Sequence, residues 1–522
     1  MNTPARSPER IVNTNPATGE VLSEHACAAA ANVQDAVARA RAAQPAWSRL
    51  GIAGRVRVLR RFQQLLLEQR SEVAACVTAE SGKPVVESLV SEVIVTLDAA
   101  RFCTENVYRV MREEDVRHAN IVMKTKRGRI LHEPVGVLGI ISPWNYPLSI
   151  PATETLAALV TGNAVVLKPS ELTPLSALYL ARLLHEAGVP QDIFQVVLGF
   201  GGTGSALIES GIDKLVFTGS VETGKRVAEA AARRLVPVVL ELGGKDPMLV
   251  LDDADVDIAS SAAVWGALMN AGQTCLSVER CYVHRNLYER FVSECARKIG
   301  QLKVGNGANA ETDIGPLISL RQLEAVEAQI EEAVAAGAIA VTGGKRLPQL
   351  GPNFFAPTLL VNVNHRMSLM QKETFGPVLP IMAFDSDDEA IALANDSDFG
   401  LSASIWTRNA RRGDALARRV NAGTVMVNDV ITCFAVAEAP HGGIKASGLG
   451  RTHGLFGMRE MVRTKYVASD LLPSIKKVWW YGYGEQLGHQ MSAFVGLLFG
   501  NSLVARAKGA AISFPSLWRK RL

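Results

Sequence analysis

Short apolar segments alternate with helical segments through the middle of the chain, and this alternation limits the fold more than any other feature. The apolar segments that have the character of buried strands are 137–142, 164–167, 194–197, 214–217 and 236–240. Strands that alternate with helices form parallel, doubly wound sheets. A second α/β unit begins near 247–250 and runs to about 437, with strands at 280–283 and 424–428. The sequence therefore predicts an α/β protein with two doubly wound parallel-sheet domains.

The length and composition indicate a globular protein with a large core. At 522 residues the chain is longer than one ordinary domain, so two or three compact units are expected. A content of 48% hydrophobic and 20% charged residues suits a soluble fold. The net charge of +4 is small against 55 basic and 51 acidic residues, and no basic patch with interleaved aromatics precedes the C-terminal tail. Nucleic-acid binding is therefore not expected.

The cysteines and the N-terminus bear on location and metal binding. Seven cysteines, odd in number and widely scattered, argue against a disulfide framework and for a reducing compartment. Cys275 and Cys281 lack zinc-type spacing and a matching second pair, so no metal site is expected. Residues 1–10 lack the apolar core of a secretory signal. These observations favour a cytoplasmic protein.

Three short motifs contain the parts needed for acyl chemistry. Cys275 ends the run Asn-Ala-Gly-Gln-Thr-Cys, Glu241 opens Glu-Leu-Gly-Gly-Lys, and Asn145 is central in Pro-Trp-Asn-Tyr-Pro. A thiol, a carboxylate and an amide donor can attack a carbonyl, manage protons and hold an oxyanion. Each residue also has a structural interpretation: a core cysteine, a strand-end carboxylate paired with Lys245, and a turn asparagine.

The three motifs resemble those of the aldehyde dehydrogenase superfamily, and further runs match it in the same order. The resemblance extends from about residue 13 to about residue 467. The additional runs are Asn-Thr-Asn-Pro-Ala-Thr-Gly-Glu at 13–20, Leu-Lys-Pro-Ser-Glu at 167–171, Phe-Thr-Gly-Ser at 217–220, Glu-Thr-Phe-Gly-Pro at 373–377 and Gly-Gly-Ile-Lys-Ala-Ser-Gly at 442–448. Their number and order indicate a family resemblance rather than a chance match.

The resemblance implies a domain organisation. An NAD(P)-binding domain would comprise 1–116 and 137–246, and a catalytic domain 247–437. A small β element for oligomerisation would comprise 117–136 and 438–470, in which 121–126 is a candidate strand and 462–470 the last strand. Homodimers or homotetramers would follow. Residues 471–522 would form a C-terminal extension.

The resemblance also assigns catalytic roles. Cys275 would be the nucleophile, and its backbone N–H would stabilise the oxyanion together with the Asn145 amide. Glu241 would activate the water that hydrolyses the thioester and help to deprotonate the thiol.

Six residues would hold the cofactor. Lys168 and Glu171 would face the adenosine ribose, and a carboxylate there favours NAD, because it accepts from a free 2′-OH and repels a 2′-phosphate. NADP is the alternative, since some relatives with this Glu use both. The remaining four are Gly219 and Ser220 beside the pyrophosphate, Glu373 on the nicotinamide ribose and Phe375 near the nicotinamide.

One motif is set aside, and two positions depart from the family pattern. Residues 199–204 fit G-x-G-x-x-G, but the family binds the pyrophosphate at the next loop, so we interpret them as a packing turn. Where many relatives have Phe in Pro-Phe-Gly-Gly, this chain has His441, which we interpret as structural rather than as part of the substrate mouth. Where many have Glu in Gly-Arg-Glu, it has Thr452, which puts a proton path through a second Glu in doubt.

The expected activity is NAD(P)-dependent oxidation of an aldehyde to a carboxylic acid, through a thiohemiacetal and a thioester on Cys275. The run 273–280 resembles bacterial succinate-semialdehyde dehydrogenases, but no Arg is identifiable as the partner of a substrate carboxylate. A medium- or long-chain or aromatic aldehyde is therefore favoured, with succinate semialdehyde as the alternative. A CoA-acylating dehydrogenase and an inactive structural relative are further alternatives, which Glu241 and the intact motifs disfavour.

The C-terminal tail combines aromatic, apolar and basic segments. An aromatic run at 478–483 precedes an apolar run at 491–505, and Arg519, Lys520 and Arg521 lie near the end. The apolar run is shorter than the roughly 20 residues that a bilayer span needs. Peripheral contact with an anionic membrane is one interpretation. Packing of a C-terminal helix on the protein's own dimer is the other, favoured one.

Overall fold

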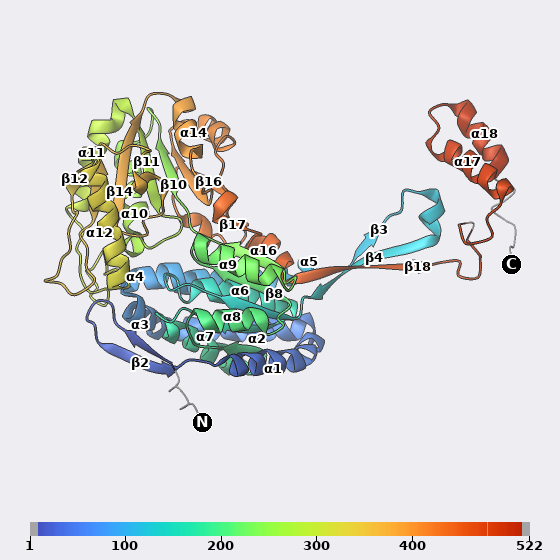
Figure 1. The fold of residues 1–522 in the computed structure, drawn as a ribbon, viewed down its shortest axis with the longest axis horizontal. Coiled ribbons are helices and arrows are strands. Elements are labelled where there is room, and N and C mark those ends of the chain that lie inside the picture. The colour runs from blue at the N-terminus through green and yellow to red at the C-terminus, as the bar shows by residue number, and fades with distance from the viewer. Residues whose placement is uncertain (1–8, 478, 514–522) are drawn as a thin grey trace, which may run out of the picture. The chain divides into compact units, whose positions relative to one another are not determined.

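The computed structural model describes residues 9–477 and 479–513. They fall into two compact units, a larger one of residues up to 112 with 132–463, and a smaller one of 113–131 with the residues from 464 onward. Both large sheets lie in the larger unit (Figure 1). The fold class predicted from the strand–helix alternation is confirmed.

The first sheet has six strands in the order β17-β9-β8-β5-β6-β7. Its strands are β5 (Val137–Ile141), β6 (Ala164–Lys168), β7 (Phe194–Val196), β8 (Lys214–Thr218), β9 (Val238–Glu241) and β17 (Gly448–Leu449). All pairs are parallel except β17, which adds to β9 in the antiparallel direction. Five of these strands arise from the apolar segments singled out in the sequence, and β17 is a short edge strand from far along the chain.

Helices before, between and after these strands cover the first sheet. They are α1 (Ala30–Arg49), α2 (Gly51–Glu68), α3 (Arg70–Ser81), α4 (Val85–Ser88), the π-helical segment η1 (Leu89–Ile94), α5 (Val95–Val110), α6 (Ser149–Thr161), α7 (Pro174–Glu186), α8 (Gly201–Glu209), α9 (Val221–Ala232) and α16 (Gly454–Glu460). A hairpin of β1 (Arg10–Thr14) and β2 (Val21–Ala26) precedes them.

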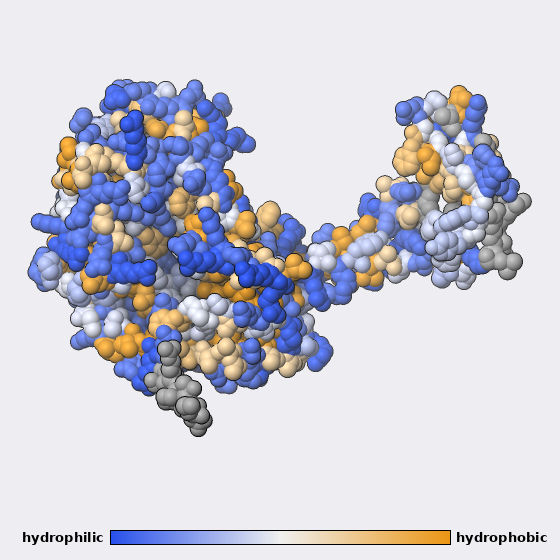
Figure 2. Space-filling model, viewed as in Figure 1, coloured by the Kyte–Doolittle hydropathy of each residue, from blue (hydrophilic) through white to orange (hydrophobic). Residues whose placement is uncertain are grey.

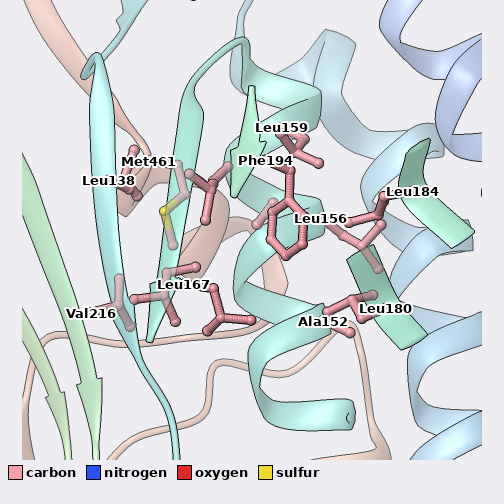
Figure 3. Close-up of a cluster of buried hydrophobic side chains, with 14 of the residues drawn as sticks. Leu138, Ala152, Leu156, Leu159, Leu167, Leu180, Leu184, Phe194, Val216 and Met461 are labelled. Atoms are coloured by element: carbon pink, nitrogen blue, oxygen red, sulfur yellow. The ribbon is translucent and has the colours of Figure 1, made fainter. Parts of the chain in front are cut away.

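Helix α6 is buried on all sides, and its residues fill the centre of this core. Figure 3 shows Leu156 and Leu159 of α6 among side chains from β5, β6, β7 and α7, including Phe194 of β7. Leu156 is fully buried, and truncation of such a leucine to alanine costs about 2–5 kcal/mol. The apolar packing therefore fixes α6 firmly, and with it any polar side chain that α6 carries.

The second sheet has seven strands in the order β12-β13-β14-β11-β10-β15-β16. They are β10 (Asp246–Val250), β11 (Val278–His284), β12 (Ile339–Thr342), β13 (Thr358–Val361), β14 (Val378–Phe384), β15 (Ser402–Trp406) and β16 (Thr424–Val427), parallel except for β12. The accompanying helices are α10 (Val256–Leu268), α11 (Arg285–Ile299), α12 (Leu320–Ala335), α13 (Ser368–Gln371), α14 (Asp387–Asn395) and α15 (Ala410–Ala417).

The smaller unit contains a three-stranded sheet and a helical hairpin. The sheet has the order β18-β4-β3, with β3 (Glu114–Val116), β4 (Lys126–Pro134) and β18 (Val462–Asp470). The prediction of a strand at 121–126 is wrong. Ile121–Thr125 is a 3-10 helix, because Asn120 O accepts from the Met123 N–H in a tight turn, and the strand begins only at Lys126.

The C-terminal extension ends in α17 (Glu485–Phe499) and α18 (Leu503–Ser513), which pack on each other. The two helices cross closely, since a Cβ at Gly509 would lie 2.5 Å from Ala493 O. No helix among residues 9–477 and 479–513 is long and apolar enough to cross a membrane. Val478 and the basic residues 519–521 lie outside the described residues, as do residues 1–8.

Candidate active site

The loop that carries Cys275 follows α10 in an unusual backbone conformation. Asn270 and Ala271 both have positive φ, at 53° and 55°, and such non-glycine residues cost of order 1–3 kcal/mol each. Gly272 has φ 72°, and a Cβ there would lie 1.9 Å from Gly376 O. Glu87 Oε2 accepts from the Asn270 N–H at 2.9 Å, which helps to hold the turn. The surroundings therefore force the chain to present Cys275 in one position.

Asn145 lies against this loop. Its Nδ2 donates to Gln273 O at 3.0 Å, and its own carbonyl accepts from Asn270 Nδ2 at 3.1 Å. The same carbonyl accepts from Lys83 Nζ at 2.7 Å, and Lys83 also pairs with Glu92 at 2.7 Å, with both side chains fully buried.

Glu92 connects this pair to the core helix. Its Oε2 accepts from the N–H groups of Leu148 and Ser149, at the start of α6. A carboxylate at a helix N-terminus is favoured by the free N–H groups and by the helix dipole. Lys83 and Glu92 thus fix the Asn145 turn to α6.

Glu241 ends β9, where its backbone carbonyl accepts from the Gly219 N–H at 3.0 Å. Its side chain is buried; Oε1 accepts from Thr452 Oγ1 at 3.3 Å, and Oε2 lies 3.9 Å from His441 Nε2. Lys245 pairs instead with Glu279 at 2.6 Å, so Glu241 is not the strand-end partner of Lys245. Burial raises the pKa of Glu241 well above its usual range, and the nearby Glu154 carboxylate adds to the rise.

Cys275 and Glu241 line one cavity. It has about 20 Å³ of space open to the centre of a water molecule, which is room for about one water. Burial first, and then the carboxylate of Glu373, raise the pKa of the Cys275 thiol well above its usual range. The resting thiol is therefore neutral, and a base has to remove its proton during attack.

Among the predicted cofactor residues, Lys168 is the last residue of β6 and Glu171 follows that strand, while Gly219 and Ser220 follow β8. Lys168 Nζ lies 3.4 Å from Glu171 Oε2, with the Glu171 side chain about one-third exposed. Gly219 and Ser220 connect β8 to α9, and Ser220 Oγ caps this helix by accepting from the Thr223 N–H at 3.3 Å. The carboxyl ends of parallel strands and the N-terminus of the following helix are where dinucleotides bind in such sheets.

Glu373 and Phe375 lie on a loop next to the Glu241 strand. Glu373 Oε1 accepts from the Gly244 N–H at 3.1 Å, and burial followed by Glu279 raises its pKa to about 8. Phe375 has φ 53° and packs edge-on against Trp144 at 5.4 Å between ring centroids. Glu279 supports this loop, because its carboxylate accepts from the N–H groups of Thr374 and Phe375.

Gly199 and Gly204 of the set-aside glycine motif are buried, whereas Gly201 and Gly202 are exposed. Gly199 has φ 157°, and a Cβ there would lie 2.0 Å from Thr203 Oγ1, which itself donates to Ala28 O.

Sequence reasoning missed several buried charged residues around the site. Glu154, Lys83, Glu92 and Glu279 are all buried, and Glu154 lines the cavity with Cys275 and Glu241. The signal for Glu154 was available, since it is the only charged residue in the otherwise apolar or uncharged α6 segment. Buried charges are costly without partners, so a carboxylate at that position calls for an explanation.

The fold and these side chains define an α/β protein with a buried thiol, a carboxylate and an amide assembled beside a dinucleotide-type strand–helix turn. Residues 3–467 match the model of the aldehyde dehydrogenase family, and the chain belongs to that family. It is accordingly an aldehyde dehydrogenase that depends on NAD or NADP.

Similar proteins include enzymes with different named substrates. The mitochondrial succinate-semialdehyde dehydrogenase of Oryza sativa is 38% identical over 87% of this chain and 85% of its own. The 4,4'-diapolycopene aldehyde oxidase of a Methylomonas species is 36% identical over 95% and 93%. Among solved structures, the NAD-dependent aldehyde dehydrogenase of Sinorhizobium meliloti matches with a TM-score of 0.87, 36% identity and coverage of 91% and 93%. An E. coli NADP-dependent enzyme matches with a TM-score of 0.85, 36% identity and coverage of 89% and 95%.

Proposed function

We propose that the chain oxidises an aldehyde to a carboxylic acid through a thioester on Cys275, with Glu241 as the base. The observation that carries this proposal is the shared cavity, in which the thiol and the carboxylate face space for about one water. Loss of the thiol proton to Glu241 allows sulfur to attack the aldehyde carbon. NAD(P)⁺, when bound, would supply the acceptor for the hydride that leaves the resulting thiohemiacetal.

The amide of Asn145 and the Cys275 N–H would stabilise the oxyanion. Asn145 donates one N–H to Gln273 O, which leaves its second N–H for the substrate oxygen. Removal of one such donor costs about 2.7–4 kcal/mol of transition-state stabilisation. Glu241, ionised again, would then take a proton from the water that cleaves the thioester.

The residues after β6 and β8 fit a dinucleotide. Lys168 and Glu171 would hold the adenosine ribose, and Gly219 and Ser220 would face the pyrophosphate at the start of α9, whose free N–H groups suit an anion. Glu373 and Phe375 would hold the nicotinamide end. The partly exposed carboxylate of Glu171 favours NAD over NADP, because its negative charge would repel a 2′-phosphate. We accordingly assign 1–116 and 137–246 to cofactor binding and 247–437 to catalysis.

The substrate that we propose is an apolar aldehyde of medium or long chain, or an aromatic one. The cavity beside Cys275 is lined by Ile150, Leu242, Leu401 and Phe434 along with Thr, Glu and His side chains, and its described lining includes no Lys or Arg. The carboxylate of succinate semialdehyde would find no Lys or Arg among these lining side chains. Succinate semialdehyde remains the alternative because of the relatives that carry that name.

We propose that the C-terminal extension binds the surface of an anionic membrane. Figure 2 shows hydrophobic residues on the surface of this segment. The exposed aromatic and aliphatic side chains of the segment include Trp480, Tyr481, Val495, Phe499, Leu503 and Val504. Lys476 and Lys508 are exposed as well. Aromatic and aliphatic groups with flanking cations suit the headgroup region.

One comparison indicates that a relative shares part of the extension. A match over 95% of 522 residues leaves about 26 residues unmatched, fewer than the 52 from 471 to 522. The similarity to the diapolycopene aldehyde oxidase therefore includes at least half of the extension. A shared extension supports a cytoplasmic enzyme that binds the surface of a membrane and receives an apolar aldehyde from it.

We also propose that the protein is a homodimer or homotetramer built through 117–136 and 438–470. Tyr466, Leu449 and Phe456 of the second segment are about half exposed, which suits an interface. Light scattering of the purified protein measures the assembly, and a monomer at micromolar concentration would contradict this proposal.

The test of the chemistry is Cys275→Ala. We expect no NADH formation at 340 nm with decanal, unchanged NAD binding, and loss of the acyl adduct that mass spectrometry finds on Cys275 in quenched wild type. Cys76→Ala is the matched control, because Cys76 lies on α3 outside the cavity. Wild-type turnover by the Cys275 variant would refute the proposal.

A further inference from the structure

Two small cavities meet at Glu154. One contains Cys275 and Glu241, and the other lies between α5 and α16 and is lined by Cys103 and Met458. Each has about 20 Å³ open to a water centre, which is room for about one water. The residues that line both cavities are Thr153, Glu154, Thr452 and His453. Glu154 is therefore the one carboxylate that reaches from the Glu241 cavity into the next.

Four buried polar atoms around these cavities have no hydrogen-bond partner in the protein. They are Glu154 Oε2, Glu241 Oε2, His441 Nδ1 and His453 Nε2, on side chains that are at least nine-tenths buried. Buried polar groups are nearly always hydrogen-bonded, to protein or to ordered water. Unpartnered atoms that face water-sized cavities point to a hydrated polar path rather than to a dry core.

The charges around Glu154 favour a shared proton. Its Oε1 accepts from Thr218 Oγ1 of β8 at 3.2 Å, and burial raises its pKa to about 8. Its charge adds to the rise in the pKa of Glu241, because two buried carboxylates repel each other when both are ionised. The pair therefore holds at least one proton at neutral pH.

The other ionisable groups that face the path do not compete for that proton. Burial lowers the pKa of His441 to about 4 and that of His453 to about 3, and it raises the pKa of Cys103 to about 12. All three are neutral near pH 7. Arg451 is the nearby cation, and its charge partly offsets the rise in the pKa of Glu241.

We propose that Glu154 is a positioning residue for deacylation, which receives through a cavity water the single proton that the pair shares and so leaves Glu241 ionised before Glu241 takes a proton from the hydrolytic water. The proposal rests on the proposed role of Glu241 as base. In the step, Glu241–COOH and Glu154–COO⁻ become Glu241–COO⁻ and Glu154–COOH, with one proton moved along the water and no change in total charge. Thr452 stands where many relatives carry a Glu, and Glu154 supplies the second carboxylate from a different element, α6.

The test separates acylation of Cys275 from its deacylation without the cofactor. p-Nitrophenyl octanoate would acylate the thiol, so the burst of nitrophenol measures acylation and the steady rate measures hydrolysis of the acyl-enzyme. Glu154→Gln keeps the acceptor for Thr218 but cannot ionise. We expect an unchanged burst and a steady rate lowered at least about tenfold, within the range of acid–base effects.

The pH dependence of the steady rate distinguishes a proton path from general damage. Glu154→Gln removes the charge that raises the pKa of Glu241. The acidic limb of the plot of steady rate against pH therefore moves to lower pH. Thr452→Val, the matched variant, removes the hydrogen bond that lowers this pKa, so the limb moves to higher pH. The proposal would be overturned if the acidic limb moved in the same direction in both variants, or if the steady rate of Glu154→Gln were unchanged. Absence of a burst in the wild type would instead overturn the proposed role of Cys275.

Discussion

Replacement of Lys83 by Met should test whether a buried ion pair holds the oxyanion donor in place. Lys83 Nζ lies 2.7 Å from Glu92 and 2.7 Å from the Asn145 carbonyl, and the pair is inaccessible to solvent. Removal of one partner from a buried pair costs about 3–5 kcal/mol, because the other charge is left unpaired. Glu92 retains two backbone N–H donors, so we expect about 3 kcal/mol, the low end of that range.

Urea unfolding followed by circular dichroism measures this loss, and kcat measures the effect on the site. We expect kcat to fall about 10²-fold, since small displacements of a positioned group have effects of that size. Glu92→Gln added to Lys83→Met should recover much of the stability, because the residual charge is gone. Arg226→Met is the control, as it breaks an exposed pair with Glu222 that is worth at most about 1 kcal/mol. Wild-type stability and kcat in Lys83→Met would refute the reasoning.

Three further predictions concern the site and the extension. Burial and Glu373 raise the pKa of Cys275, so the rate of its alkylation by iodoacetamide should keep rising with pH up to pH 9. A plateau below pH 8 in the rates measured by mass spectrometry would contradict this. Glu171→Ser should lower the KM for NADP relative to NAD by about tenfold by removing a repulsive charge; an unchanged ratio counts against the ribose assignment. Truncation after Leu472 should abolish flotation with anionic vesicles while leaving turnover of a short soluble aldehyde intact, and equal flotation removes the membrane proposal.

The main-chain architecture was largely predictable because parallel strands are short apolar segments. The segments that became β5, β6 and β8 are recognisable from composition alone, since each is buried on both faces of a sheet. The 121–126 segment failed because its apolar residues follow a turn-forming asparagine, and local turn chemistry prevailed over β-propensity. Strand β17 has two residues and carries no periodic signal of its own.

The site was predictable only where motifs are local. Cys275 and Glu241 lie in short runs that are recognisable directly, whereas the partners of Lys83 and Glu154 lie far along the chain. Lys83 meets the Asn145 carbonyl 62 positions away, and Glu154 meets Thr218 64 positions away. Such pairs depend on how helices pack on a sheet, which a one-dimensional pattern does not specify. Buried charge in an apolar helix is the one local sign that they exist.

The late edge strand β17 has a consequence for synthesis of the protein. Gly448 pairs with Glu241, and a Cβ at that glycine would lie 2.2 Å from Leu240 O, so the contact accepts no larger residue. Thr452, which donates to the Glu241 carboxylate, arrives from the same stretch. Until residues 448–452 have been synthesised, the contacts that this stretch makes with Leu240 and Glu241 cannot form. The surroundings that tune the Glu241 carboxylate are therefore completed only late in synthesis, long after Cys275 has been added to the chain.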